Sequence, residues 1–161
     1  MEHSKSRLPG FEQFIEKLQK DGCKVGLWAA FLRCEKPELI GLSIKNMMHN
    51  ADGKPITKGG ASPFYLMDVT QPEVQAALRK HIKRFMQQYK PDLVKFDFGY
   101  ELPALSMSAP ADPSQGGERL LKLCMDVVTG ALSEENPDVA VMYYALSPLF
   151  IDQFDIHSTD D

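Results

Sequence analysis

Three segments of the chain carry apolar residues at helical spacing, and each predicts a helix with one buried face. These segments span residues 11–21, 72–90 and 118–132. The second segment has an apolar stripe formed by Val74, Leu78, Ile82, Phe85 and Tyr89. We expect Thr70 to cap this helix and Pro72 to lie in its first turn, because both residue types favour helix starts.

Short apolar runs without alternation lie between these helices and predict buried parallel strands. The runs cover residues 24–32, 92–98, 139–146 and 154–158. The resulting β-α-β order predicts a parallel sheet with right-handed crossovers, and therefore an α/β fold. Residues 33–69 and 99–116 are rich in Pro, Gly, Ser and Asn, so we expect long loops, the first with one short hairpin. Both loops follow strands, which places them at the carboxyl edge of the sheet, where α/β proteins bind ligands.

Composition narrows the class of protein. The 161 residues include 18 Lys plus Arg and 22 Asp plus Glu, which gives a formal net charge of −4. This mildly acidic balance disfavours a nucleic-acid partner. We also expect no membrane span, because no tract of roughly 18 uncharged apolar residues occurs. Free thiols favour a soluble, cytoplasmic protein, although a secreted enzyme without its N-terminal segment would look the same.

The sequence predicts neither a metal nor a cofactor. Its three cysteines have no CxxC spacing, and no pair of histidines has the spacing of metal ligands. Gly59-Gly60 does not fit a phosphate-binding loop.

Ionisable residues at the ends of two predicted strands mark the candidate chemistry. Lys95 and Asp97 alternate with Phe96 and Phe98, so we expect the two charges on one face and the two rings on the other. Buried charges are costly unless they are paired or used, which leaves two alternatives to a catalytic role: a structural ion pair, or a strand end that has reached solvent.

Asp160 and Asp161 follow the last predicted strand. Two carboxylates at the ends of different parallel strands suit glycoside hydrolysis, in which one attacks the anomeric carbon and the other protonates the leaving oxygen. Trp28, near the end of the first strand, offers a ring that can stack on a sugar, although a lone tryptophan is more often a core residue.

Three motifs resemble the catalytic barrel of glycoside hydrolase clan D, and family 36, the α-galactosidases, is the nearest match. They are Gly26-Leu27-Trp28 on a strand, Leu66-Met67-Asp68 followed by Pro72-Glu73-Val74, and Lys95-Phe96-Asp97. The resemblance implies that Trp28 packs on the sugar, that Asp97 is the nucleophile and that Lys95 binds sugar hydroxyls. It further implies Asp160 as the acid/base, with Asp161 as the fallback and a substrate contact.

The same resemblance implies that residues 1–161 are part of a TIM barrel, about its third to sixth strands. A complete barrel needs roughly 200 residues or more, so we expect a partial β/α barrel catalytic domain, a fragment of a larger glycosidase. The expected activity is retaining hydrolysis of α-linked sugars, with α-galactosides first. The expected partner is a small carbohydrate or oligosaccharide.

Two alternatives remain open at this point. The chain could be a non-catalytic carbohydrate-binding fragment that self-associates through the exposed edges of its sheet. It could also be a flavodoxin-like domain, although Arg33-Cys34-Glu35-Lys36 is not the glycine loop that such a domain needs after its first strand.

Overall fold

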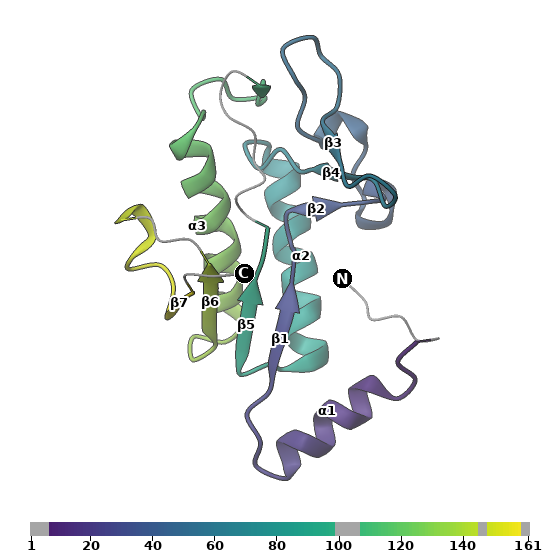
Figure 1. The fold of residues 1–161 in the computed structure, drawn as a ribbon, viewed down its shortest axis with the longest axis vertical. Helices are drawn as coiled ribbons and strands as arrows, with labels where there is room; N and C mark the ends of the chain where they lie inside the picture. The colour runs from purple at the N-terminus through teal and green to yellow at the C-terminus, as the bar shows by residue number, and fades with distance from the viewer. Residues whose placement is uncertain (1–6, 99–106, 145–147, 159–161) are drawn as a thin grey trace.

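The computed structural model describes residues 7–98, 107–144 and 148–158, and its framework is a four-stranded parallel sheet. The strands lie side by side in the order β1–β5–β6–β7 (Figure 1). Their bounds are Gly26–Ala29 for β1, Leu93–Phe96 for β5, Ala140–Tyr144 for β6 and Ile156–Ser158 for β7. Each strand of this sheet pairs with the one that precedes it along the chain, so the strand order never reverses.

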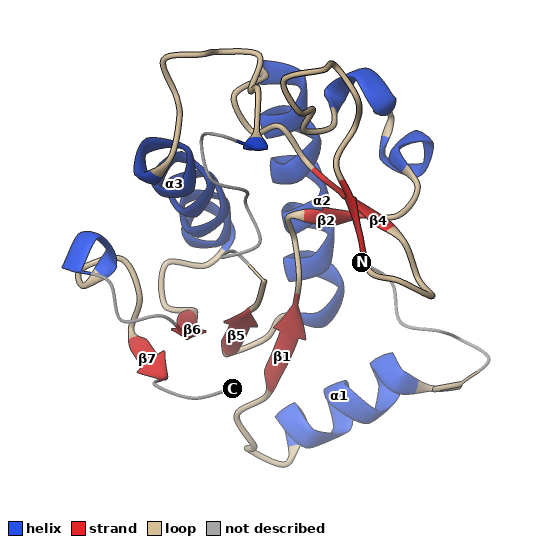
Figure 2. Ribbon diagram, turned by 45° about the horizontal axis from the view of Figure 1, so that its top comes forward, coloured by secondary structure: helices blue, strands red, loops and turns tan. Residues whose placement is uncertain are grey.

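Two long helices cover one face of this sheet. Helix α2 (Pro72–Tyr89) precedes β5 and helix α3 (Glu118–Glu135) precedes β6, and the two pack against each other. Figure 2 shows both on the same side of the row of strands. Helices on a single face with unreversed strand order are the arrangement of a β/α barrel, whereas a doubly wound, flavodoxin-like sheet carries helices on both faces. The described fold is therefore an α/β segment of barrel type.

The predicted helices are confirmed with small changes at their ends. Helix α1 (Phe11–Lys20) packs on the end of α2, where the rings of Phe11 and Tyr89 lie 5.9 Å apart. All five residues of the predicted α2 stripe are buried. The cap prediction was wrong, because Gln71 occupies the N-cap position of α2 and the Thr70 hydroxyl donates a hydrogen bond to Asp68 instead.

Residues 33–69 contain more structure than the single hairpin predicted. Strands β2 (Arg33–Cys34), β3 (Thr57–Lys58) and β4 (Phe64–Leu66) form an antiparallel sheet in the order β2–β4–β3. The 3-10 helices η1 (Pro37–Ile40) and η2 (Ile44–Asn46) lie between β2 and β3. The expected hairpin is β3–β4; β2 was missed because two residues are too few to show an alternating pattern. In Figure 1 this small sheet lies beyond the carboxyl end of β1.

The core fills the space between the parallel sheet and the two long helices. Val94, Phe96, Val141 and Tyr143 point from β5 and β6 toward the helices and are buried. Leu78 and Ile82 of α2 and Val128 and Leu132 of α3 are buried as well. Helix α3 thus buries the apolar face predicted for it. None of the helices in residues 7–98, 107–144 and 148–158 is long and apolar enough to cross a membrane.

Aspartates at the amino edge of the parallel sheet tie neighbouring strands together. Asp92, just before β5, accepts the backbone N–H of Val25 (2.9 Å) and the ammonium of Lys24 (2.7 Å). Asp155, just before β7, accepts the backbone N–H of Val141 (2.8 Å). Each carboxylate therefore satisfies an N–H at the start of the adjacent strand, which strengthens the sheet at the edge opposite the long loops.

Replacing Asp92 by Asn is expected to lower the free energy of unfolding by about 1 kcal/mol at neutral pH. The hydrogen bonds from Lys24 and Val25 lower the pKa of Asp92, so its stabilising contribution is present above the unfolded-state pKa. That contribution is lost as pH falls through the folded-state pKa. Urea unfolding of D92N and wild type should therefore differ near pH 7 and converge in acid, once the Asp92 carboxyl is protonated in the folded protein as well. Exposed Asp52→Asn is the control, and an equal loss at both pH values would contradict the assignment.

Candidate functional site

The carboxylate of Asp97 lies buried directly after β5, with 3% of the residue exposed. One oxygen, Oδ2, accepts the indole N–H of Trp28 at 2.5 Å, and the other, Oδ1, accepts the backbone N–H of Phe98 at 2.6 Å. The backbone N–H of Asp97 donates to the carbonyl of Ala29 at 2.9 Å. Three hydrogen bonds thus fix both the backbone and the carboxylate of this residue at the carboxyl edge of the sheet.

Strand register places the three predicted residues of this edge together. Trp28 of β1 is the pairing partner of Lys95 of β5, and Asp97 lies two residues beyond Lys95. Lys95 alternates with the buried Val94 and Phe96, so it projects from the sheet face opposite the helices. The structure therefore brings Trp28, Lys95 and Asp97 to one locality. Their contacts with a sugar remain predictions.

Trp28 is not a core residue. Its exposed fraction is 47%, and its indole lies edge to face against the ring of Phe98, with centroids 5.9 Å apart. The N–H edge is held by Asp97, while much of the ring stays accessible to a ligand. This is the geometry that a stacking platform needs: a fixed orientation together with open area.

The expectation that Phe96 and Phe98 share one face was wrong. Phe96 is fully buried against the helices, but β5 ends at this residue. Phe98 has a φ of 60°, a left-handed conformation that breaks the alternation of a strand. Its ring therefore turns to Trp28 and joins the site instead of the core.

Arg33 is a site residue that the sequence reasoning missed. Its guanidinium carbon lies 3.2 Å from the centroid of the Phe98 ring and 4.2 Å from that of Phe64. Phe64 comes from β4, so this stack joins the small antiparallel sheet to the end of β5. Only the pairing of β2 with β4, which no local pattern reveals, brings these residues together.

A cleft of about 1020 Å³ opens beside Trp28. Its walls come from β2 and η1, from the β3–β4 hairpin and from α2. Small-molecule sites commonly enclose roughly 300–1,000 Å³, so the cleft can hold a ligand the size of an oligosaccharide.

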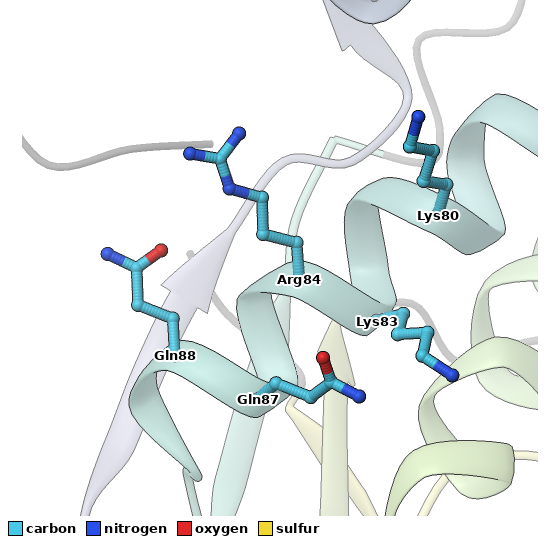
Figure 3. A pocket seen from close by; sticks show the side chains of 5 residues that line it. All are labelled: Lys80, Lys83, Arg84, Gln87 and Gln88. Carbon is cyan, nitrogen blue, oxygen red and sulfur yellow. The ribbon is translucent and has the colours of Figure 1, made fainter.

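A smaller depression of about 470 Å³ lies on α2 and is lined by Lys80, Lys83, Arg84, Gln87 and Gln88 (Figure 3). Three of these side chains are already bound to acidic residues. Lys83 and Gln87 contact Glu135 at 3.4 and 3.2 Å, and Gln88 donates to Glu12 at 2.8 Å. We therefore assign this depression to the packing of α2 against its neighbouring helices, not to a ligand.

Asp68 is a second buried carboxylate, with 2% of the residue exposed. Its Oδ1 accepts the N–H of Thr70 (3.1 Å) and the Thr70 hydroxyl (2.6 Å). Its Oδ2 accepts the amide of Gln71 (3.0 Å) and the N–H of Ala111 (2.8 Å). Asp68 therefore ties the segment between β5 and α3 to the start of α2. Beneath it, burial and then the Asp68 charge raise the pKa of the Cys124 thiol.

Replacing Asp68 by Asn should destabilise the protein by about 2–3 kcal/mol, because the new NH2 group faces donors that need acceptors. Thr70→Val removes the hydroxyl that donates to Asp68 and accepts the Asp112 N–H, leaves the bond from Ala111 to Asp68 in place, and should cost about 1–2 kcal/mol. Urea unfolding gives both values. Hydrogen exchange of the Ala111 amide should accelerate in D68N and stay near the wild-type rate in T70V. An unchanged exchange rate in D68N would contradict the hydrogen bond from Ala111 to the Asp68 carboxylate.

Asp160 and Asp161, the predicted acid/base and its fallback, lie outside the described residues. The described part ends at Ser158, the last residue of β7. Within it, no group of three or more His, Cys, Asp and Glu side chains could hold a metal ion.

The fold resembles parts of several glycoside hydrolases of known structure. The α-galactosidase TtGalA from Thermus thermophilus matches 94% of the chain with a TM-score of 0.67 and 21% identity. A GH31 family sulfoquinovosidase from E. rectale matches 88% with a TM-score of 0.68 and 18% identity. The GH36 α-galactosidase AgaA from Geobacillus stearothermophilus matches 87% with a TM-score of 0.63 and 15% identity. At such identities the likeness shows the fold alone, a β/α-barrel segment.

The chain spans only part of each of these proteins: 32% of TtGalA, 22% of the sulfoquinovosidase and 20% of AgaA. No family model and no curated protein matches the sequence.

Proposed function

We propose that this chain carries the nucleophile side of a retaining α-glycosidase site. The observation that carries the proposal is the 2.5 Å hydrogen bond from the half-exposed Trp28 indole to the buried Asp97 carboxylate at the carboxyl ends of adjacent parallel strands. A sugar on the Trp28 ring would lie beside a carboxylate whose orientation is already set. In β/α-barrel enzymes this edge holds the active site.

In the proposed first step, a carboxylate oxygen of Asp97 attacks the anomeric carbon as the bond to the leaving oxygen breaks. Asp160 donates the proton to that oxygen. In the second step Asp160 takes a proton from water, which attacks the anomeric carbon and releases Asp97. Two inversions give net retention, and this requires carboxyl groups about 5–5.5 Å apart. Asp161 is the alternative acid/base.

Lys95 and Trp28 bind the sugar in this proposal. The Lys95 ammonium can donate to ring hydroxyls, and Trp28 supplies the apolar platform. We take an α-galactoside as the first substrate, because TtGalA is an α-galactosidase whose structures include complexes with stachyose and p-nitrophenyl α-D-galactopyranoside.

In the complete enzyme, replacing Asp97 by Ala should lower hydrolysis of p-nitrophenyl α-D-galactopyranoside by roughly a thousandfold or more, because no covalent intermediate can form. Azide in the buffer should restore p-nitrophenol release and yield a β-galactosyl azide, since azide attacks the anomeric carbon in place of the missing carboxylate. Asp52→Ala, an exposed turn residue, is the control. Turnover of D97A without azide at the wild-type rate would overturn the nucleophile assignment.

One observation favours a second candidate, a carbohydrate-binding fragment that associates with itself. In the described part of the chain, β1 and β7 are the edges of the sheet and each pairs on one side only. Ile156 of β7 is 40% exposed, and Leu93 lies on the face opposite the helices. Open edges beside apolar surface promote association between chains.

This second candidate predicts a concentration-dependent dimer in sedimentation velocity. Ile156→Lys should shift the equilibrium toward monomer by about tenfold, because a charge on an edge strand opposes strand pairing. Ile44→Lys on η2, the same residue type with the same 40% exposure, should leave it unchanged. A wild-type protein that stays monomeric at high concentration would contradict association through the edges.

A further inference from the structure

The cleft beside Trp28 reaches down to the hydrophobic core. Three of the residues that line it, Phe31, Met67 and Leu78, are almost fully buried and belong to that core. They come from three separate parts of the fold: the segment after β1, the segment after β4, and α2. The cleft therefore has an apolar base, which is the usual lining of a small-molecule site.

Leu39 projects into solvent from the wall of this cleft. Its exposed fraction is 76%, the highest among the large apolar side chains of the described residues. Other residues attach η1 to the protein, because Pro37 is buried and Ile40 packs against the core. Leu39 is thus not needed for that attachment. Trp28, which is 47% exposed, lines the same cleft, so two exposed apolar side chains share one concave surface.

The cationic side chains of the cleft already interact with other groups of the protein. The guanidinium carbon of Arg33 lies 3.2 Å from the centroid of the Phe98 ring and 4.2 Å from that of Phe64, so both rings stack on this side chain. His81 and Arg84 also take part in interactions within the protein. The cleft therefore offers a ligand apolar surface more than uncompensated charge.

Cys34 and the two residues after it complete the wall. Burial raises the pKa of the Cys34 thiol, which therefore stays neutral at pH 7. Glu35 and Lys36 have opposite charges at adjacent positions, so together they add no net charge. This part of the wall is compatible with an uncharged ligand.

The cleft begins at the proposed sugar site. Trp28 lines the cleft and also donates its indole N–H to the Asp97 carboxylate. Phe98 contacts both Trp28 and Arg33, so it joins the sugar site to the cleft wall. A glycoside whose sugar lies on Trp28 can therefore extend its aglycone, the group that leaves in hydrolysis, into the cleft.

We propose that this cleft binds an apolar aglycone, and that the substrate class is α-glycosides that carry an alkyl or aryl group. Leu39 and Trp28 are the exposed contacts, and the core residues at the base of the cleft limit its depth. This inference rests on the proposed function for the position of the sugar. A sugar as aglycone is the competing outcome of the test.

The test compares methyl and n-hexyl α-D-galactopyranoside, which share the sugar and differ by five methylenes. Each buried methylene favours binding by roughly fourfold, so burial of two gives the hexyl glycoside a preference of about tenfold or more. Isothermal titration calorimetry gives both affinities. The heat-capacity change should be more negative for the hexyl glycoside, and the preference should persist in roughly 1 M salt, where charge interactions are screened.

Leu39→Ser should reduce the preference for the hexyl glycoside at least threefold and leave the affinity for the methyl glycoside unchanged. Leu39→Met, which keeps an apolar side chain of similar size, should retain the preference. Leu8→Ser is the matched control, because Leu8 is also an exposed leucine, 49% accessible, but does not line the cleft. It should change neither affinity.

Equal affinity for the two glycosides, a tighter complex with α-1,4-galactobiose than with the hexyl glycoside, or a preference unaffected by Leu39→Ser would overturn the apolar subsite. Each of these results leaves the proposed hydrolase intact if p-nitrophenyl α-D-galactopyranoside is hydrolysed. Absence of binding by either galactoside would overturn the subsite as well. A hexyl preference that depends on Leu39, without hydrolysis of any α-galactoside, would sustain the subsite and overturn the proposed activity instead.

Discussion

The parallel pairing of β1 with β5 is the constraint on which the site depends. Its register sets Trp28 opposite Lys95 and lets the Asp97 N–H bond to the carbonyl of Ala29. The indole N–H then meets the Asp97 carboxylate. A shift of one residue would send the tryptophan to the helix-covered face, because side chains alternate along a strand. The packed core beneath the sheet, in which Val94 and Phe96 are fully buried, holds that register.

The two edges of the sheet have different roles. At the amino edge, Asp92 and Asp155 accept backbone N–H groups of the neighbouring strands and connections are short. At the carboxyl edge, the buried Asp68 binds the segment that follows β5, and the small antiparallel sheet supplies Arg33 and Phe64. Buried or strand-linking carboxylates thus stabilise both edges, and only the carboxyl edge also carries the side chains that can meet a ligand. Asp68 keeps that second edge ordered without belonging to the proposed chemistry.

Periodicity sufficed to predict the three helices and the parallel sheet, because long apolar stripes leave a strong local signal. It also placed Trp28, Lys95 and Asp97 at one edge, since parallel strands of successive β-α-β units end together. It could not locate Arg33 or the Asp68 network. Arg33 meets Phe64 only through the pairing of β2 with β4, and the Asp68 donor Ala111 lies far along the chain. The sequence also could not predict that the Phe98 ring turns toward Trp28, because this depends on the left-handed backbone conformation of one residue.

The two aspartates that link strands at the amino edge of the sheet also affect how the chain folds. Asp92 binds the strand before its own, and Asp155 does the same one step further along the sheet. When β5 and β7 dock, each is therefore bonded to its neighbour by a residue that arrives with it. Parallel pairing still joins residues far apart in the sequence, Gly26 with Leu93 and Leu93 with Ala140, so these docking steps close long loops and should be slow, and each carboxylate holds its strand only after the loop has closed.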